Sequence, residues 1–470
     1  MSEAGINSAP PAKRALVFRL PGKESADNAH ILMRALENAG VPGELCPYWP
    51  DGEASWKTET VLLEREIGSA PRLTAVEFQQ RFGFELDLVE LSLHQFATEP
   101  LTPELLLPES VWRQHLRGVA LLAAERMEAS DADVVFVAHG AETVSRIIAE
   151  MAARLGMRFL YWESGFFPGY VYVDPWAPHF FRGGGWIDSL PMPAAPSQQT
   201  IDFLNDWLHT RESKYDQALE DISSAVSEWV AADDRPILFL PGQISTDANV
   251  VVNLGSYDSL SDLYHEVLRH VPSNWRVLYK PHPKAIIDPL LTTSLPNDRF
   301  LRADIHIHDA FALSTAVLTV SSNVGLEAIL YGKPTLVLGQ PVYAGRQLSF
   351  DISEYEKITD TLSNLPNTSR QDETNSRFLD LLTGFLINQN THGRLRNLLC
   401  VNVPPRLSTR LSYYNSKTID IVKLARLIAH DRFEKKNHPL LESQAVKMIF
   451  KFITLAKQKC LQKHDGGAKS

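Results

Sequence analysis

Residues 278–283, Leu-Tyr-Lys-Pro-His-Pro, and residues 319–328, Thr-Val-Ser-Ser-Asn-Val-Gly-Leu-Glu-Ala, decide the fold of this chain. Each stretch begins as an apolar strand and turns sharply into polar residues. The second turn runs into an apolar helical pattern over residues 324–331, which ends at Gly-Lys-Pro, residues 332–334. Free N–H groups at a helix start, with hydroxyls beside them, are a natural phosphate cradle. The sequence therefore predicts a phosphate site in its C-terminal half.

Strands and helices alternate on both sides of these stretches, which is typical of parallel sheets covered on both faces. We expect two Rossmann-like, doubly wound α/β domains with a central cleft. The predicted strands are 15–20, 133–138, 158–162, 236–240, 276–279, 316–320 and 335–338. The predicted divisions are an N-terminal domain at 1–200, a charged helical connector at 201–234, a C-terminal domain at 235–400 and a basic helical tail at 401–470.

The composition is that of an ordinary globular protein, with 44% hydrophobic and 22% charged residues among 470. No apolar run is long enough for a membrane span, and the polar first 14 residues do not resemble a signal peptide. Three widely spaced cysteines match no metal spacing and fit a reducing compartment. These features predict a cytoplasmic protein.

Charge is distributed unevenly along the chain. Residues 402–470 hold 14 Lys and Arg against 5 Asp and Glu, although the whole chain has a net charge of −10. An acidic body argues against nucleic acid as a partner. The stretch 439–463 predicts a basic amphipathic helix, which would pack on the protein or make a peripheral contact to a membrane or a partner.

The Lys-Pro-His-Pro turn is the first candidate for binding chemistry. Pro281 and Pro283 stiffen the backbone and fix the direction of His282, and Lys280 adds a cation. An imidazole beside a phosphate would stabilise the charge that develops as a nucleotide leaves. A strand-end turn with a half-buried histidine is the structural alternative.

The second candidate is the helix start at Ser321, Ser322 and Asn323, with Glu327 one turn later. Its hydroxyls and N–H groups could bind phosphate, and the carboxyl of Glu327 could accept hydrogen bonds from ribose hydroxyls. Ser322 or Asn323 would also serve as a simple helix cap. Capping and phosphate binding are compatible, so both interpretations stay open.

These motifs, with residues 332–339, Gly-Lys-Pro-Thr-Leu-Val-Leu-Gly, resemble the bacterial capsule polysaccharide biosynthesis family. Its members include β-Kdo transferases that use CMP-Kdo. The resemblance covers roughly residues 130–350 and is most specific in its C-terminal half. It implies the two-domain GT-B architecture and a His-Pro motif that contacts the CMP phosphate.

The resemblance also implies catalytic residues. Residues 243–249, Gln-Ile-Ser-Thr-Asp-Ala-Asn, resemble the family's Gln-x-x-x-Asp-x-Gln motif, with Asn249 in place of the last Gln. Asp247 would be the nucleophile of a retaining reaction, and Gln243 would contact the donor. A turn-capping aspartate is the alternative interpretation of this position.

Two further positions follow from the same resemblance. Glu163 matches an acidic-Gly-aromatic segment, with Ser164 replacing a second acid, and would be the general acid/base on the acceptor. An exposed turn glutamate is the alternative. Arg346 follows a Tyr-Ala-Gly segment and could meet the donor's carboxylate or phosphate.

The leading hypothesis is a metal-independent glycosyltransferase of capsule biosynthesis that moves a CMP-activated ulosonic acid onto a glycan or glycolipid acceptor. Kdo is the first candidate for that sugar. The CMP-sugar is a substrate, and no cofactor is expected. A transferase or 2-epimerase acting on a UDP-sugar is one alternative. A non-catalytic glycan-assembly subunit is another, and nucleotide binding distinguishes the three.

Overall fold

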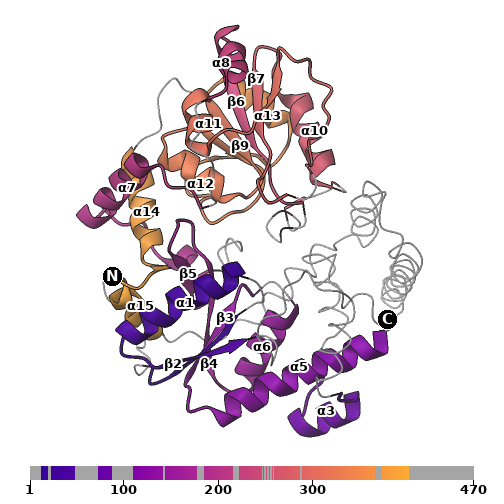
Figure 1. Ribbon diagram of the computed structural model, residues 1–470, viewed down its shortest axis with the longest axis vertical. Coiled ribbons are helices and arrows are strands. Elements are labelled where there is room, and N and C mark those ends of the chain that lie inside the picture. The colour runs from indigo at the N-terminus through magenta and orange to yellow at the C-terminus, as the bar shows by residue number, and fades with distance from the viewer. Residues whose placement is uncertain are drawn as a thin grey trace, which may run out of the picture.

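A computed structural model describes residues 12–19, 23–47, 72–86, 109–140, 143–176, 185–214, 222–245, 247, 250, 253–254, 257, 259–285, 288–365 and 372–401. It contains two six-stranded sheets, each covered by helices (Figure 1). The predicted α/β class with two Rossmann-like domains is confirmed. Asn249 and the basic tail lie outside the described residues, so their predicted roles are not addressed by the structure.

The first sheet has the order β12-β5-β4-β3-β1-β2. β1, β2, β3 and β4 run parallel, and β5 and β12 are antiparallel additions at one edge. Its strands are β1 (Ala15–Arg19), β2 (Gly43–Pro47), β3 (Val134–Ala138), β4 (Arg158–Ser164), β5 (Val171–Asp174) and β12 (Leu386–Ile387).

The second sheet is entirely parallel and has the order β11-β10-β9-β6-β7-β8. The order reverses between β6 and β9, which is the topological switch point of a doubly wound sheet. Its strands are β6 (Ile237–Pro241), β7 (Arg276–Lys280), β8 (Phe300–Arg302), β9 (Ala316–Thr319), β10 (Thr335–Val337) and β11 (Phe350–Asp351).

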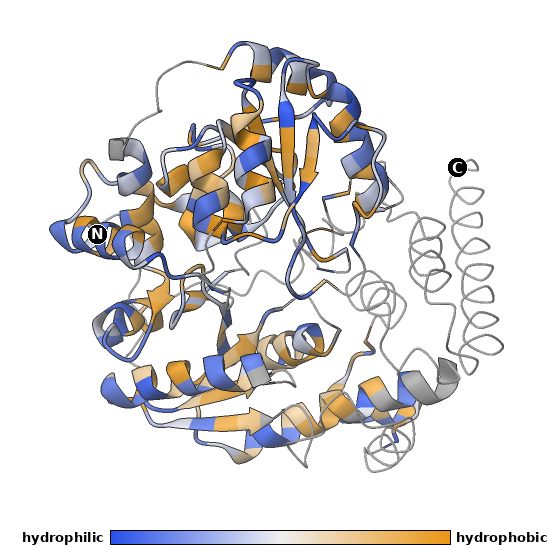
Figure 2. Ribbon diagram, turned by 45° about the horizontal axis from the view of Figure 1, so that its top comes forward, coloured by the Kyte–Doolittle hydropathy of each residue, from blue (hydrophilic) through white to orange (hydrophobic). Residues whose placement is uncertain are grey.

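Buried side chains on successive strand positions point into different cores. In β1, Val17 joins the cluster that contains α1 residues, whereas Leu16 joins the cluster that contains α5 and α6 residues. In β6, Leu238 and Phe239 divide in the same way between two further clusters. The central positions of the strands are accordingly mostly apolar, and the covering helices carry both apolar and polar residues (Figure 2).

Twelve α-helices are described in all. They are α1 (Lys23–Asn38), α3 (Ala75–Phe82), α5 (Glu109–Ala129), α6 (Thr143–Arg154), α7 (Gln198–Thr210), α8 (Ser224–Ala231), α10 (Leu260–His270), α11 (Ile307–Leu313), α12 (Asn323–Leu330), α13 (Glu356–Ser363), α14 (Asp372–Thr383) and α15 (His392–Leu399). A 3₁₀ turn spans Trp186–Ser189.

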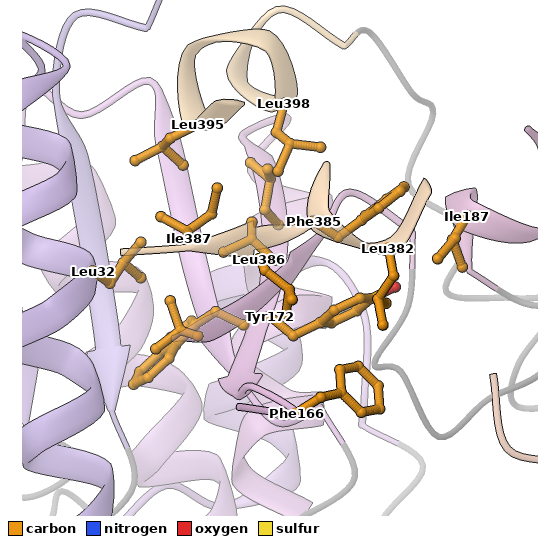
Figure 3. Packing of buried hydrophobic residues seen from close by; sticks show 14 of the residues in the cluster. Leu32, Phe166, Tyr172, Ile187, Leu382, Phe385, Leu386, Ile387, Leu395 and Leu398 are labelled. Carbon is orange, nitrogen blue, oxygen red and sulfur yellow. The ribbon is translucent and has the colours of Figure 1, made fainter. Parts of the chain in front are cut away.

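The chain returns to the first domain after the second sheet is complete. Leu386 of β12 pairs with Tyr172 of β5, and Leu395 and Leu398 of α15 pack above that edge in one cluster with Leu32 of α1 (Figure 3). The guanidinium of Arg396 also donates a hydrogen bond to the Ala39 carbonyl, at 2.9 Å. This return differs from the predicted boundary, which placed everything to residue 400 in the second domain.

The predicted boundary differs because the sequence of the returning segment does not show which domain it packs against. β12 has two residues, which is too short for a periodic pattern. Its apolar side chains would suit either domain, and only the packing on β5 and α1 decides between them.

Candidate functional site

A cavity of about 340 Å³ lies between the two domains and is lined by residues of both. Ten of the eleven predicted site residues line it. They are Glu163, Gln243, Asp247, Lys280, His282, Pro283, Ser321, Ser322, Asn323 and Glu327.

The cavity lies at the carboxyl ends of the strands in both sheets. Residues 241–244 follow β6 and residues 321–324 follow β9, so the second domain contributes its switch point. Ligands of doubly wound sheets bind at this position. The first domain contributes His139 after β3 and Glu163 from the end of β4.

The Lys-Pro-His-Pro turn packs closely on the turn after β6. A Cβ on Gly242 would lie 2.7 Å from the His282 backbone nitrogen, so only glycine permits this approach. The Gly242 N–H donates to the Lys280 carbonyl at 2.7 Å. The two motifs therefore form one surface.

His282 is oriented by its neighbour. The Lys284 N–H donates to Nδ1 of His282 at 3.1 Å, which places the proton of the neutral ring on Nε2. Burial lowers the pKa of His282, with the charges of nearby lysines acting in the same direction and that of Asp247 opposing. The imidazole of His282 is therefore neutral at pH 7, with its proton on Nε2.

Lys280 lines the cavity but is already paired. Its amine donates to Asp304 at 2.8 Å, and its side chain is 6% exposed, against 87% for Asp304. The ammonium charge is thus partly neutralised from outside the cavity.

The start of α12 is built around Ser322. Its hydroxyl accepts a hydrogen bond from the Val324 N–H at 3.2 Å, which identifies Ser322 as the N-cap. The Tyr343 hydroxyl donates to the Ser322 carbonyl at 2.6 Å. Gly325 makes room for that ring, since a Cβ there would lie 2.1 Å from the hydroxyl oxygen.

Gln243 braces this turn from the side of β6. Its Oε1 accepts hydrogen bonds from the Thr319 hydroxyl at 3.1 Å and from the Val320 N–H at 3.0 Å. The side-chain oxygen is therefore committed to holding the end of β9.

Glu327 is a buried carboxyl on the cavity wall, with 7% of its surface exposed. Burial raises the pKa of Glu327 to about 8, against the opposing charge of Lys214. The group is therefore largely protonated at neutral pH, and it can both donate to and accept from a hydroxyl.

Asp247 lies in a turn after β6. Its N–H donates to the Ile244 carbonyl at 3.0 Å, and its own carbonyl accepts from the Val250 N–H at 2.9 Å. Asp247 therefore lies in a backbone turn and also lines the cavity.

Glu163 faces the same cavity from the first domain and is 7% exposed. Nε2 of His139 lies 3.9 Å from its carboxylate. His139 has a left-handed backbone, with φ of 57°, and non-glycine residues in that conformation are often found at functional sites. The exposed-glutamate alternative does not hold in this structure.

Two charged cavity residues were missed by the sequence reasoning. Lys214 lies on the connector after α7, and Glu24 lies in the first turn of α1. Glu24 forms an ion pair with Lys284 at 2.8 Å, across the two domains. Burial alone would raise the pKa of Glu24, but the hydrogen bond and charge of Lys284, with the charge of Lys214, lower it.

Arg346 does not line this cavity. Its guanidinium donates to the Ile187 carbonyl at 3.2 Å and to the Asp188 carboxylate at 2.9 Å, and it lies over the Phe378 ring. The structure therefore gives this arginine an interdomain bracing position and does not bring it together with the other ten residues.

Within the described residues, no group of three or more His, Cys, Asp or Glu side chains could hold a metal ion. No helix in this part of the chain is long and apolar enough to cross a membrane.

Residues 203–375, which include the whole second sheet, match the family model described as capsule polysaccharide biosynthesis protein. This part of the chain is similar to that family. The predicted resemblance is thereby confirmed. The family region contains the Lys-Pro-His-Pro turn, α12 and Asp247, whereas Glu163 lies outside it.

The curated relatives match segments of this chain that differ in length. Protein FixF of Sinorhizobium fredii is 24% identical over 284 residues, which cover 59% of this chain and 66% of FixF. Capsule polysaccharide modification protein LipA of Neisseria meningitidis serogroup A is 28% identical over 145 residues, or 30% of this chain and 20% of LipA. This chain thus spans less than two thirds of the length of either relative.

Two of the solved structures that match this chain are similar to it only at low identity. The β-Kdo 2,4-transferase of Thermosulfurimonas dismutans KpsC is 20% identical, covers 57% of this chain and 87% of its own, and has a TM-score of 0.42. Spinosyn rhamnosyltransferase SpnG is 15% identical, covers 82% of this chain and 99% of its own, and has a TM-score of 0.35.

Proposed function

We propose that this protein is a retaining glycosyltransferase of capsule polysaccharide biosynthesis, which moves Kdo from CMP-Kdo onto a glycan or glycolipid acceptor. One observation carries the proposal. Asp247 of the second domain and Glu163 of the first domain line one interdomain cavity together with a helix N-terminus and His282. Two carboxyl groups beside a phosphate cradle are what a double-displacement transferase requires.

The donor's nucleotide would lie on the second domain. Its phosphate would meet the N-terminus of α12 at Ser321 and Ser322, and the Nε2–H of His282. Protonated Glu327 would contact ribose hydroxyls. The helix dipole, the imidazole and Lys280 would take up the charge of the leaving phosphate, so this chemistry needs no metal or cofactor.

In the first step, a carboxylate oxygen of Asp247 would attack the anomeric carbon, and the carbon–oxygen bond to the phosphate would break as CMP leaves. In the second step, the acceptor hydroxyl would attack that carbon from the opposite side and displace Asp247. The carboxylate of Glu163 would take the hydroxyl proton. Two inversions give net retention.

The acceptor would approach from the first domain, which supplies Glu163 and His139. We place the reaction at the cytoplasmic face of the inner membrane, with the basic tail as the contact to the membrane or to capsule assembly proteins. Nucleic acid has no part in it.

Two measurements test this function. Calorimetry with CMP, UDP and GDP should show selective CMP binding. Intact-mass spectrometry with CMP-Kdo should show the mass of one added Kdo, which Asp247→Asn abolishes and Glu163→Gln lets accumulate. Preference for UDP would favour the UDP-sugar transferase or epimerase, and no nucleotide binding would favour the non-catalytic subunit.

A further inference from the structure

Lys214 reaches the cavity from the connector between the two domains, a position that carries no family motif. α7 ends at Thr210, and its C-cap Arg211 has a left-handed backbone with φ of 56°. The guanidinium of Arg211 forms an ion pair with Asp309 of α11 at 2.5 Å. This contact fastens the start of the connector to the second domain.

The next residue is fastened as well. The Glu212 carbonyl accepts a hydrogen bond from Trp207 Nε1 at 3.1 Å, and Nε2 of His308 lies 3.4 Å from the same oxygen. Lys214 follows two positions later and lines the cavity. Because the backbone just before Lys214 is held by these contacts, we expect its side chain to be restricted in position.

The surroundings of Lys214 are acidic on every side. Burial lowers the pKa of Lys214, whereas the charges of Glu24, Glu163 and Asp247 oppose that shift; the carboxyl of Glu327, largely protonated at neutral pH, lies nearby. Among the described residues, no carboxylate lies within the 4 Å ion-pair distance of its amine. In contrast to Lys280, Lys214 therefore has no ion-pair partner in the part of the chain that the structure describes.

An anionic sugar needs a cation in this cavity. A sugar carboxylate that approached Asp247 and Glu163 without one would be repelled by both groups. Arg346, the cation expected from the sequence, lies elsewhere and is held by Asp188. His282 and the N-terminus of α12 belong to the phosphate end of the site. Lys214 lines the same cavity as Asp247 and Glu163, and its charge interacts with carboxyl groups of both domains as well as with His282.

We propose that Lys214 binds the carboxylate of the donor sugar and so selects acidic sugars over neutral ones. The inference rests on the proposed function and deepens it. A partly buried ammonium binds a carboxylate more strongly than an exposed one does, because water screens the pair less.

The test compares two ligands that differ by the sugar. Calorimetry is run with CMP and with CMP-Kdo on Asp247→Asn protein, which cannot consume the donor. Adding Lys214→Met should weaken CMP-Kdo binding by about tenfold or more and change CMP binding by less than about twofold. Lys214→Arg should keep most of the affinity for CMP-Kdo. Lys357→Met, on exposed α13, is the matched control and should change neither.

Two results would overturn the inference. An equal loss for CMP and CMP-Kdo would assign Lys214 to the phosphate, and no loss for either would remove it from the donor site. Failure of the starting protein to bind CMP would instead refute the proposed function, and this inference with it. Selective loss in Lys214→Met, with retention in Lys214→Arg, supports a charge contact and excludes misfolding as the cause.

Discussion

Glu24 in the first turn of α1 and Lys284 after the Lys-Pro-His-Pro turn form a 2.8 Å ion pair that joins the two domains at the cavity. The two side chains are 50% and 48% exposed. Such pairs contribute at most about 1 kcal/mol to stability. The same Lys284 orients His282 through its backbone N–H, so the pair connects the interdomain contact to the phosphate end of the site.

Reversing one charge of this pair should open the cavity. In Glu24→Lys the two ammonium groups repel, and we expect a larger radius of gyration by small-angle scattering at low salt, with little change in unfolding free energy. The double variant Glu24→Lys/Lys284→Glu should restore the compact form. Glu37→Lys, farther along α1, is the control. An unchanged radius in Glu24→Lys would show that the pair does not hold the domains together.

Glu327 should make stability depend on pH. Its pKa rises from 4.5 in the unfolded chain to about 8 in the folded one. The unfolded state therefore binds fewer protons between these values, and stability falls as pH rises from about 5 to 8 before it levels off. Urea unfolding of Glu327→Gln should lack most of this decline.

Glu354→Gln, at an exposed ion pair on the same domain, is the control and should retain the decline. A pH dependence in Glu327→Gln identical to that of the parent would mean that Glu327 is ionised in the folded state at neutral pH.

Gly325 is required by the Tyr343 ring. In Gly325→Ala the new Cβ would lie 2.1 Å from the Tyr343 hydroxyl and 2.8 Å from Thr319 Cγ2. We expect a loss of about 1–3 kcal/mol in unfolding free energy. Adding Tyr343→Phe removes the oxygen and should recover part of the loss, although it also ends the hydrogen bond to Ser322.

Gly393→Ala is the matched control, because that helical glycine of α15 has no atom within 4 Å of the added carbon. It should be neutral or stabilising by up to about 1 kcal/mol. Equal destabilisation by the two substitutions would contradict the steric explanation.

His282 should make CMP binding depend on pH. Its pKa is lowered by burial, so the imidazole is neutral at pH 7 in this structure. A bound phosphate favours the protonated ring and raises that pKa, and CMP should therefore bind more tightly as pH falls below 7. His282→Asn should weaken binding and flatten this dependence in calorimetry between pH 5.5 and 8.

His392→Asn, at an exposed histidine of α15, should leave the profile unchanged. A profile that persists in His282→Asn would assign the titration to another group, such as the phosphate itself.

The sequence by itself determined the parallel sheets and most of the second domain's site. Apolar runs such as 277–279 end in polar turns, and in parallel strands those turns meet at one edge of the sheet. Ten predicted side chains consequently line one cavity. Hydrophobic periodicity, turn residues and helix caps each involve residues that are close together in the sequence. They can therefore be recognised from the sequence alone.

Only the tertiary structure decided the remaining features. Lys214 looks like any other charge in a polar connector, and its place among four carboxyl groups depends on how the domains meet. Arg346 follows a recognisable segment, yet Asp188, 158 positions earlier, holds it away from the cavity. Residues 386–387 complete the first sheet although they follow the second. Contacts between distant segments arise from packing and charge in space, and no single stretch of sequence encodes its partner.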